Sequence, residues 1–248
     1  MNFVDIHSHI LPGLDDGPSD IADSIKMAKV AYCDGISVIV ATPHDRDVLA
    51  KFSPSKIISL TNTVNKMLVE QFIPVKVFVG MENHLAMDSP EQFDKGMALP
   101  IEGTGSMLIE LPFEFVPWYA EDIMFRLQDR GLQLILVHPE RNAWIQKNFS
   151  ILSRMIDMGV LSQITAGSLM GKFGPLVQKT ACLLLRDGLA HIVASDSHSY
   201  KGSRSPILSE AVDYIGKVIG FEAANRMAYE TPASIINNLY PGMSEASG

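Results

Sequence analysis

Short apolar runs rich in β-branched residues alternate along this chain with longer segments of helical periodicity. The seven candidate strands read FVDIHS, ISVIVAT, VKVFVG, SMLIEL, LQLILVH, VLSQIT and AHIVAS. Because they are apolar on both faces, they are typical of parallel strands covered by helices. Segments such as DIADSIKMAKVAYCDG, closed by Gly35, and YAEDIMFRLQDRG, closed by Gly131, predict the covering helices. With no linker between these βα units, residues 1–248 are predicted to form one α/β domain, a (β/α)7 TIM-like barrel.

Composition limits the class of protein. Hydrophobic residues make up 47% and charged residues 19% of the chain, as in a globular enzyme. The net charge of −8 argues against a general nucleic-acid binder, because phosphate backbones demand a basic face. The apolar runs are too short to span a bilayer, and no amino-terminal signal is visible. Cys33 and Cys182 are predicted to be buried thiols in a reduced, cytoplasmic protein with no membrane insertion.

After Ser205 the chain reads as helices, and the final segment, GMSEASG, is expected to fray.

Ionisable side chains gather where the predicted strands end. They are His7 and His9 at the first strand, His44 after the second, Glu82 after the third, Glu110 at the fourth, His138 at the fifth, and Asp196 and His198 after the seventh. In a parallel barrel these strand ends share one rim, where active sites are built. Imidazole and carboxylate ligands suit zinc, manganese or iron, and shared carboxylates suit clusters of such ions. The sequence therefore predicts a metal cluster at this rim.

The spacing of the first two histidines fits a shared ion. Alternate residues of a strand point to the same face, with Cα atoms about 6.5–7 Å apart, so His7 and His9 can reach one ion. Asp5 is predicted to lie on the same face of the strand as these histidines and to orient one of their rings without itself binding the ion.

Four other ionisable residues fall outside this pattern. His84 is predicted to lie on a surface loop and His191 to open the seventh strand. Asp15 and Asp16, in GLDDGP, are interpreted as a turn and helix cap, with a supporting role near the site as the alternative.

The motifs DIHSHILPGLDDGP, TPH, GME, LIEL, HPER and ASDSH occur in this order between about residue 3 and residue 240. In content and spacing the chain resembles the polymerase and histidinol phosphatase (PHP) superfamily. Within it, the chain resembles the bacterial capsular and exopolysaccharide protein-tyrosine phosphatases. The resemblance implies a distorted (β/α)7 barrel and a cluster of two to three divalent transition-metal ions (Mn, Fe or Zn). It also implies a phosphotyrosine-bearing partner, the tail of a bacterial tyrosine kinase that controls polysaccharide export.

The resemblance also distributes the donors among the ions. His7 and His9 would hold one ion with Glu82 and Asp196; Glu82 and Glu110 would bridge or share ions, with His138 on the second; His44 and His198 would complete the third.

Phosphatase chemistry agrees with this site. Clustered divalent ions lower the pKa of a bound water and neutralise phosphoryl oxygens. Arg141 and Arg204 lie on the loops after the fifth and seventh strands, where a guanidinium can hold phosphate bidentately, and are the predicted catalytic residues. A thiolate mechanism needs a cysteine six residues before an arginine, but Ile39 and Gly188 stand at those positions.

Three alternatives stay open. The chain could be a small-molecule phosphatase such as histidinol-phosphate phosphatase. It could be a phosphodiesterase or nuclease of the same superfamily, which the acidic charge disfavours, or a metal-binding regulatory protein without catalysis, which the two arginines disfavour. An aromatic segment follows Glu110 and contains Phe113, Phe115, Trp118 and Tyr119. One or two of these rings are predicted to flank a phosphotyrosine ring, while the others pack onto the barrel.

Overall fold

The computed structural model describes residues 2–236. Its strands are β1 (Phe3–Ser8), β2 (Ile36–Ala41), β3 (Lys76–Val79), β4 (Glu82–His84), β5 (Ser106–Glu110), β6 (Gln133–Val137), β7 (Leu161–Thr165) and β8 (Ile192–Ala194). All seven predicted strands are present. The short strand β4 is additional, and the predicted frayed tail lies outside the described residues.

The strands form two parallel sheets rather than one continuous one. The first has the order β1-β2-β3 and the second the order β4-β5-β6-β7-β8. The chain passes from one sheet to the other at Gly80 and Met81, between β3 and β4. A Cβ atom on Gly80 would lie 2.7 Å from Val40 Cγ1, so this crossing requires glycine. If β3 and β4 are counted as one interrupted strand, the fold has the seven units that the sequence predicts.

Two isolated parallel bridges join the sheets. One pairs Ser8 with Ser197 and the other pairs His44 with Glu82. At the first, the amide of His9 donates to the carbonyl of Ser197 over 2.8 Å. The predicted parallel α/β barrel is thus distorted, with a seam at each junction between the two sheets.

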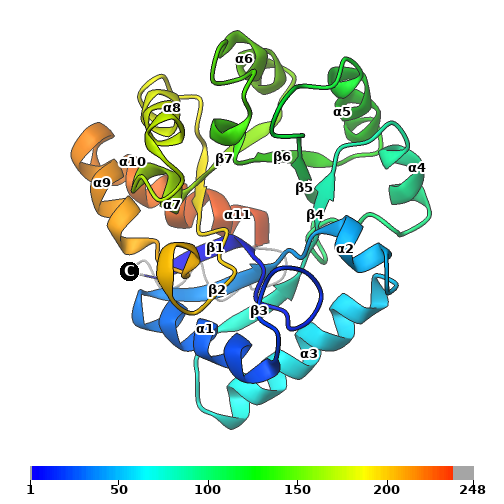
Figure 1. Ribbon diagram of the computed structural model, residues 1–248, viewed down its shortest axis with the longest axis vertical. Coiled ribbons are helices and arrows are strands. Elements are labelled where there is room, and N and C mark those ends of the chain that lie inside the picture. Colours follow the sequence, from blue (N-terminus) through cyan, green and yellow to red (C-terminus); the bar gives the residue numbers. More distant parts are fainter. Residues whose placement is uncertain (1, 237–248) are drawn as a thin grey trace.

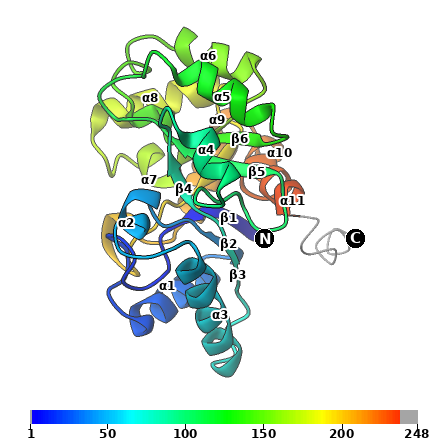
Figure 2. The same ribbon diagram turned by 90° about the vertical axis from the view of Figure 1, so that its right-hand side faces the viewer.

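Helices cover the outside of both sheets (Figures 1 and 2). They are α1 (Ile21–Cys33), α2 (Asp45–Leu49), α3 (Ser55–Glu70), α4 (Ser89–Asp94), α5 (Ala120–Gln128), α6 (Ser150–Asp157), α7 (Ala166–Leu169), α8 (Pro175–Arg186), α9 (Ser209–Ile219), α10 (Phe221–Asn225) and α11 (Thr231–Ile236), with short turns η1 (Pro139–Arg141), η2 (Gly202–Arg204) and η3 (Arg226–Glu230). As predicted, Gly35 and Gly131 follow α1 and α5 with positive φ angles of 96° and 83°. None of the helices in the described part of the chain is long and apolar enough to cross a membrane.

The apolar core has an outer and an inner layer. The outer layer lies between strands and helices, and includes Ile39 of β2 and Ile57 of α3. The inner layer fills the barrel with alternate strand residues such as Val38 and Ile135, and Ile236 of α11 packs against it. Figure 2 shows α11 beside the amino-terminal end of β1, so apolar residues close that end and the opposite rim is left to polar side chains.

The prediction of two buried thiols is wrong for Cys33, which is exposed, and Cys182 is only partly buried. Cys33 ends α1, whose buried face is formed by residues such as Met27, Ala28 and Ala31. Because residues two apart point about 200° from each other around a helix, Cys33 turns away from the face that carries Ala31.

Candidate metal centre

A bulge in β1 directs the first histidine into the site. The register between β1 and β2 shifts between Asp5 and Ser8, which interrupts the strict alternation of faces. Ile6 therefore joins the inner apolar layer while the next residue, His7, faces the polar rim. The Nε2 atoms of His7 and His9 lie 3.3 Å apart, close enough to approach a single ion.

The prediction that Asp5 orients a histidine ring is wrong. Because the bulge lies between them, Asp5 and the two histidines do not lie on the same face of the strand. The Asp5 carboxylate accepts hydrogen bonds from the backbone amide (2.9 Å) and hydroxyl (2.5 Å) of Ser195. The ring of His7 instead lies against Gln163, with Nδ1 2.8 Å from Oε1. The ring of His9 lies against Asp15, with Nδ1 2.7 Å from Oδ2. These two contacts leave both Nε2 atoms directed at the site.

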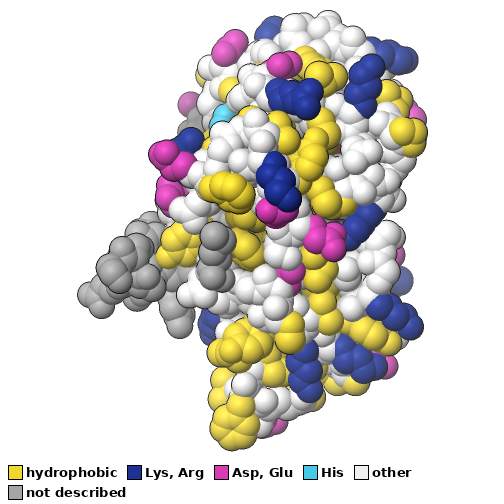
Figure 3. All heavy atoms as spheres, turned by 90° about the vertical axis from the view of Figure 1, so that its left-hand side faces the viewer, with side chains coloured by type: hydrophobic (Ala, Val, Ile, Leu, Met, Phe, Trp, Pro, Cys, Tyr) yellow, Lys and Arg dark blue, Asp and Glu magenta, His cyan; other side chains and the backbone are white. Residues whose placement is uncertain are grey.

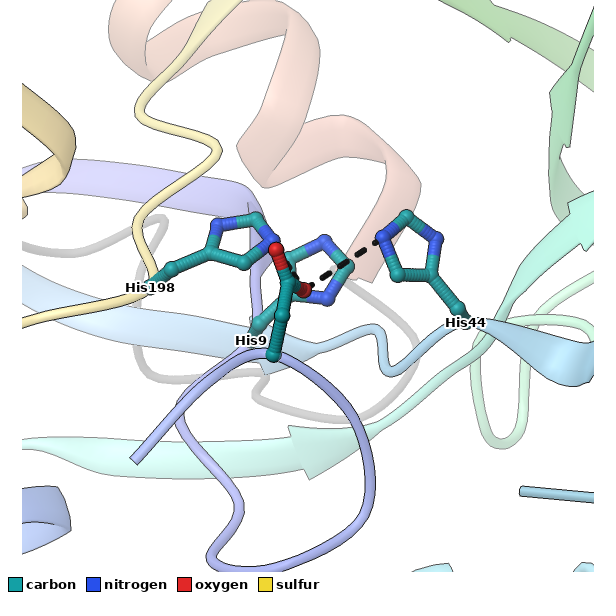
Figure 4. A group of neighbouring side chains, drawn as sticks. His9, His44 and His198 are labelled. Carbon is teal, nitrogen blue, oxygen red and sulfur yellow. Dashed lines mark ion pairs between the residues drawn. The ribbon is translucent and has the colours of Figure 1, made fainter. Parts of the chain in front are cut away.

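The structure brings all eight predicted donors into one connected cluster. The ring of His9 lies 4.5 Å from that of His44 and 3.7 Å from that of His198, and Figure 4 shows these three rings converging from different segments. His138 Nε2 lies 2.8 Å from Glu82 Oε1 and 3.7 Å from Glu110 Oε1. Asp196 Oδ1 lies 3.6 Å from His7 Nε2.

Within the cluster, donor atoms form three groups compact enough to hold an ion. They are His7, His9 and Glu82; His44, Glu82 and Glu110; and His9, Asp16, His44 and His198. Glu82 belongs to two groups, which fits a shared carboxylate. The third group contains Asp16, which sequence reasoning assigned to a turn: its Oδ1 lies 3.1 Å from His198 Nε2.

Two donors are aimed by unusual backbone geometry. His138 and Asp196 have φ angles of 35° and 50°, in the left-handed region that residues other than glycine rarely occupy. His138 directly follows β6 and Asp196 lies two residues after the end of β8, so both turns lie at the carboxyl ends of strands. Such strain is tolerated where the surrounding structure enforces it, and it concentrates at functional sites.

The electrostatics of the cluster favour bound cations. Burial opposes the charge on Glu82, yet the imidazoles of His7, His138 and His44 hold its pKa well below the usual range. Burial also lowers the pKa of His9, but the carboxylates of Asp15 and Glu82 raise it to about 10. Buried carboxylates therefore require positive charge here, and protonated imidazoles or metal ions can supply it.

One buried atom supports the fit of a metal. Glu82 Oε2 accepts no hydrogen bond, although His44 Nδ1, His9 Nε2 and His7 Nε2 lie 2.9, 3.3 and 3.4 Å away. Buried carboxylate oxygens without a donor are rare in folded proteins. A carboxylate oxygen surrounded by ring nitrogens is the donor arrangement of an imidazole–carboxylate metal site, so these residues fit the implied ions.

Both predicted arginines border the cluster. Arg141 Nη2 lies 2.7 Å from Asp196 Oδ2, and its guanidinium lies 3.9 Å from the centre of the Phe173 ring. Arg204 donates to Asp16 Oδ2 over 2.7 Å, and its Nη2 lies 2.5 Å from His198 Nε2. Each guanidinium is therefore held beside the donors by specific partners.

The two histidines left out of the pattern have different places. His191 directly precedes β8, as predicted, and its Nδ1 accepts a hydrogen bond from the amide of Ser162. His84 is not on a surface loop: it ends β4, and its Nδ1 lies 3.6 Å from Glu110 Oε2. Pairing of β4 with β5 places it there.

Sequence reasoning gave Asp15 and Asp16 a supporting role near the site only as the alternative to a turn and helix cap, and it missed Gln163. The loop that carries the two aspartates returns to the site because Gly17 passes so close to the carbonyl of His9 that a Cβ atom there would collide with it. A glycine after two acidic residues is a weak signal for this return. Gln163 gives no clear signal, because its strand also carries the polar residues Ser162 and Thr165.

The fold and the donor set define a parallel α/β barrel protein with a candidate multinuclear metal centre at its carboxyl rim. Within that class, the chain belongs to the family described as capsular polysaccharide synthesis, CpsB/CapC, whose model matches residues 3–237. This confirms the resemblance predicted from the motifs.

The names of similar proteins agree with membership of this family. The tyrosine-protein phosphatase YwqE of Bacillus subtilis is 39% identical over 88% of this chain and 86% of its own length. A putative tyrosine-protein phosphatase, CapC of Staphylococcus aureus, is 36% identical over 79% and 77%. The chain also matches a crystal structure from the pair YwqE of B. subtilis and CpsB of Streptococcus pneumoniae, described as metal-dependent tyrosine phosphatases. The TM-score is 0.89 at 37% identity, over 95% of this chain and 94% of that one.

A more distant likeness concerns the fold alone. A dihydropyrimidinase from Brevibacillus agri superposes with a TM-score of 0.61 at 12% identity, over 96% of this chain and 71% of that one.

Proposed function

We propose that this protein is a metal-dependent protein-tyrosine phosphatase. The observation that carries the proposal is the convergence of His7, Glu82, Asp196 and the other donors on one rim, with two arginines at its edge. The relatives named as tyrosine-protein phosphatases support the same activity. We further propose that all eight predicted donors, together with Asp16, hold two to three divalent ions of manganese, iron or zinc.

The chain's own residues would bind and orient the phosphate. Bound divalent ions supply an activated water and neutralise charge on the phosphoryl oxygens. Arg141 has further N–H groups besides the one facing Asp196, and its stacking on Phe173 fixes the plane in which they point. A guanidinium fixed in this way offers paired donors to phosphoryl oxygens and stabilises the charge that develops during transfer.

Arg204 would approach the phosphate from the other side. Its contacts with Asp16 and His198 place it at the third donor group, and it is about one-third exposed, so it can meet an arriving substrate. The ring of Phe113 lies 5.5 Å from that of His138, where it can contact the tyrosine ring. Gln163 and Asp15 would keep the two innermost imidazoles in their donor orientation.

The partner we propose is the tyrosine-bearing tail of a polysaccharide-export kinase, reached from the cytoplasmic side. The net charge of −8 suits a protein substrate better than a nucleic acid. On the face shown in Figure 3, basic side chains are interspersed with acidic and hydrophobic ones. The second candidate, a small-molecule phosphatase for esters such as histidinol phosphate, would use the same metal chemistry.

The test is a comparison of kcat/KM for matched phosphotyrosine and phosphoserine peptides and for histidinol phosphate, with and without chelator. The phosphotyrosine peptide should be the best substrate, and the chelator should abolish its hydrolysis. Arg141→Ala should lose about 10²–10³ in turnover, whereas Arg126→Ala, which breaks an exposed ion pair with Glu91, serves as the arginine control. A higher kcat/KM for histidinol phosphate would refute the tyrosine-phosphatase proposal.

A further inference from the structure

An aromatic groove opens beside the metal centre, between the start of α5 and the start of α6. It has a volume of about 310 Å3, within the ~300–1,000 Å3 range of small-ligand sites, and its principal lining residues are Val116, Pro117, Trp118, Glu121, Trp144 and Arg154. The indoles of Trp118 and Trp144 are 86% and 48% exposed. Two large exposed rings lining one groove are a feature of interaction sites, because their apolar surface gains from being covered.

The segment that leads from β5 to the groove carries two aromatic rings, one beside the metal centre and one beside the groove. Phe113 lies 5.5 Å from the ring of His138, at the metal centre. Two residues further along, Phe115 meets Trp144 edge to face with the ring centres 6.5 Å apart. A substrate segment whose phosphotyrosine enters the site beside Phe113 would reach Trp144 by extending along this segment.

Asn142 holds this surface rigidly against the site. It directly follows Arg141, and its Nδ2 donates to the carbonyls of Pro112 and Phe115 over 2.6 and 2.9 Å. Its Oδ1 accepts from the amides of Trp144 and Ile145, each over 3.0 Å. The loop that bears the aromatic rings and the loop that bears the phosphate-binding arginine are therefore one scaffold.

The charge of the groove selects the kind of side chain it accepts. The charged residues lining it are Glu121 and Arg154, and they pair with each other at 3.0 Å. Their charges cancel, so the remaining surface offers indole rings and aliphatic groups. Aromatic rings pair favourably with such surfaces in offset or edge-to-face contacts.

We propose that this groove binds an aromatic side chain of the substrate, located near the phosphotyrosine in its sequence. This inference rests on the proposed function and adds to it a second subsite, which contacts the substrate away from the phosphate. The rings select the segment, while the metal centre and arginines act on the phosphate.

The two tryptophans make the groove directly observable. Trp118 and Trp144 are the only tryptophans of the chain, so its intrinsic tryptophan fluorescence arises entirely at this groove. Titration of the metal-loaded protein with a short unphosphorylated peptide containing tyrosine should change this fluorescence, and the matched alanine peptide should not. Because no turnover is involved, this measurement separates failure of the groove from failure of the phosphatase proposal.

Kinetic measurements are the second part of the test. A phosphotyrosine peptide with a neighbouring tyrosine should have a KM about 2- to 10-fold lower than its alanine counterpart, at similar kcat. In Trp144→Ala, and in the more exposed Trp118→Ala, the two peptides should have equal kcat/KM. The ratio is measured within each variant, so a general loss of folding cannot imitate this result.

Phe125→Ala is the matched control, because Phe125 is an exposed ring on the same helix, α5, and does not line the groove. It should retain the preference of the parent protein. Equal kcat/KM for both peptides in the parent, with identical fluorescence titrations, would overturn the proposal. A fluorescence change that depends on protein concentration in the absence of peptide would overturn it as well, by showing that a second copy covers the groove.

Discussion

Replacing Asn142 by alanine should destabilise the protein far more than loss of an ordinary polar side chain. Four backbone groups would lose their partner: the carbonyls of Pro112 and Phe115 and the amides of Trp144 and Ile145. Ile145 is fully buried, so its orphaned N–H costs about 1–3 kcal/mol, whereas the other three lie nearer to water and cost roughly 0.5 kcal/mol each. The sum is about 2.5–4.5 kcal/mol, which for a chain of this length lowers Tm by about 5–18 °C.

Thermal unfolding followed by circular dichroism measures this change. Asn148→Ala is the matched control, because the Asn148 side chain bonds only to Ser150 and is exposed; we expect it to cost less than about 1 kcal/mol. Well below its Tm, Asn142→Ala should also hydrolyse phosphotyrosine peptide more slowly, since Arg141 is the preceding residue. If Asn142→Ala unfolds within about 3 °C of the parent, water replaces these bonds and the reasoning is refuted.

Three further predictions concern the metal centre. The parent protein should carry more than one transition-metal ion per chain, and the double change His7→Ala, His9→Ala should lower both metal content and activity; parental activity in that variant would mean that the site lies elsewhere. Arg141→Ala should reduce turnover by about 10²–10³ while elemental analysis still finds parental metal, whereas loss of metal would indicate a structural role. Finally, burial lowers the pKa of His9 but Asp15 and Glu82 raise it to about 10, so without metal this imidazole is protonated at pH 8 and must lose its proton to bind an ion. Metal loading at pH 8 should therefore release protons, seen by calorimetry in buffers of different ionisation enthalpy, and a buffer-independent heat would contradict the charge assignment.

The donors that the sequence identifies share one property: each lies at the end of an apolar run. His44, His138 and Asp196 could be placed on one rim because parallel strands all end on the same side of a barrel. The strand ends themselves follow from composition, since β-branched residues stop where polar ones begin.

What the sequence leaves open depends on tertiary contacts. Strand β4 is three residues long and polar, so its hydrogen bonds to β5, rather than any propensity, define it. Asp16 lies in a loop whose path is set by packing, and a local pattern reads such a loop as a turn. The prediction for Asp5 is wrong because alternate residues of a strand share a face only as far as a bulge, and β1 has a bulge between Asp5 and Ser8.

The seams between the two sheets have a consequence for how the protein folds. β1 to β3 come from one contiguous stretch of chain, and β4 to β8 come from the next. Stretches with mostly local contacts tend to open and close as separate cooperative units. Within residues 2–236, the strand pairing between the two stretches consists of two single bridges. Donors from both units meet at these bridges: His9 and His198 at one, His44 and Glu82 at the other. Ions held there would couple the two units, so the metal-free protein should exchange its amide hydrogens in two independent blocks that metal binding merges into one.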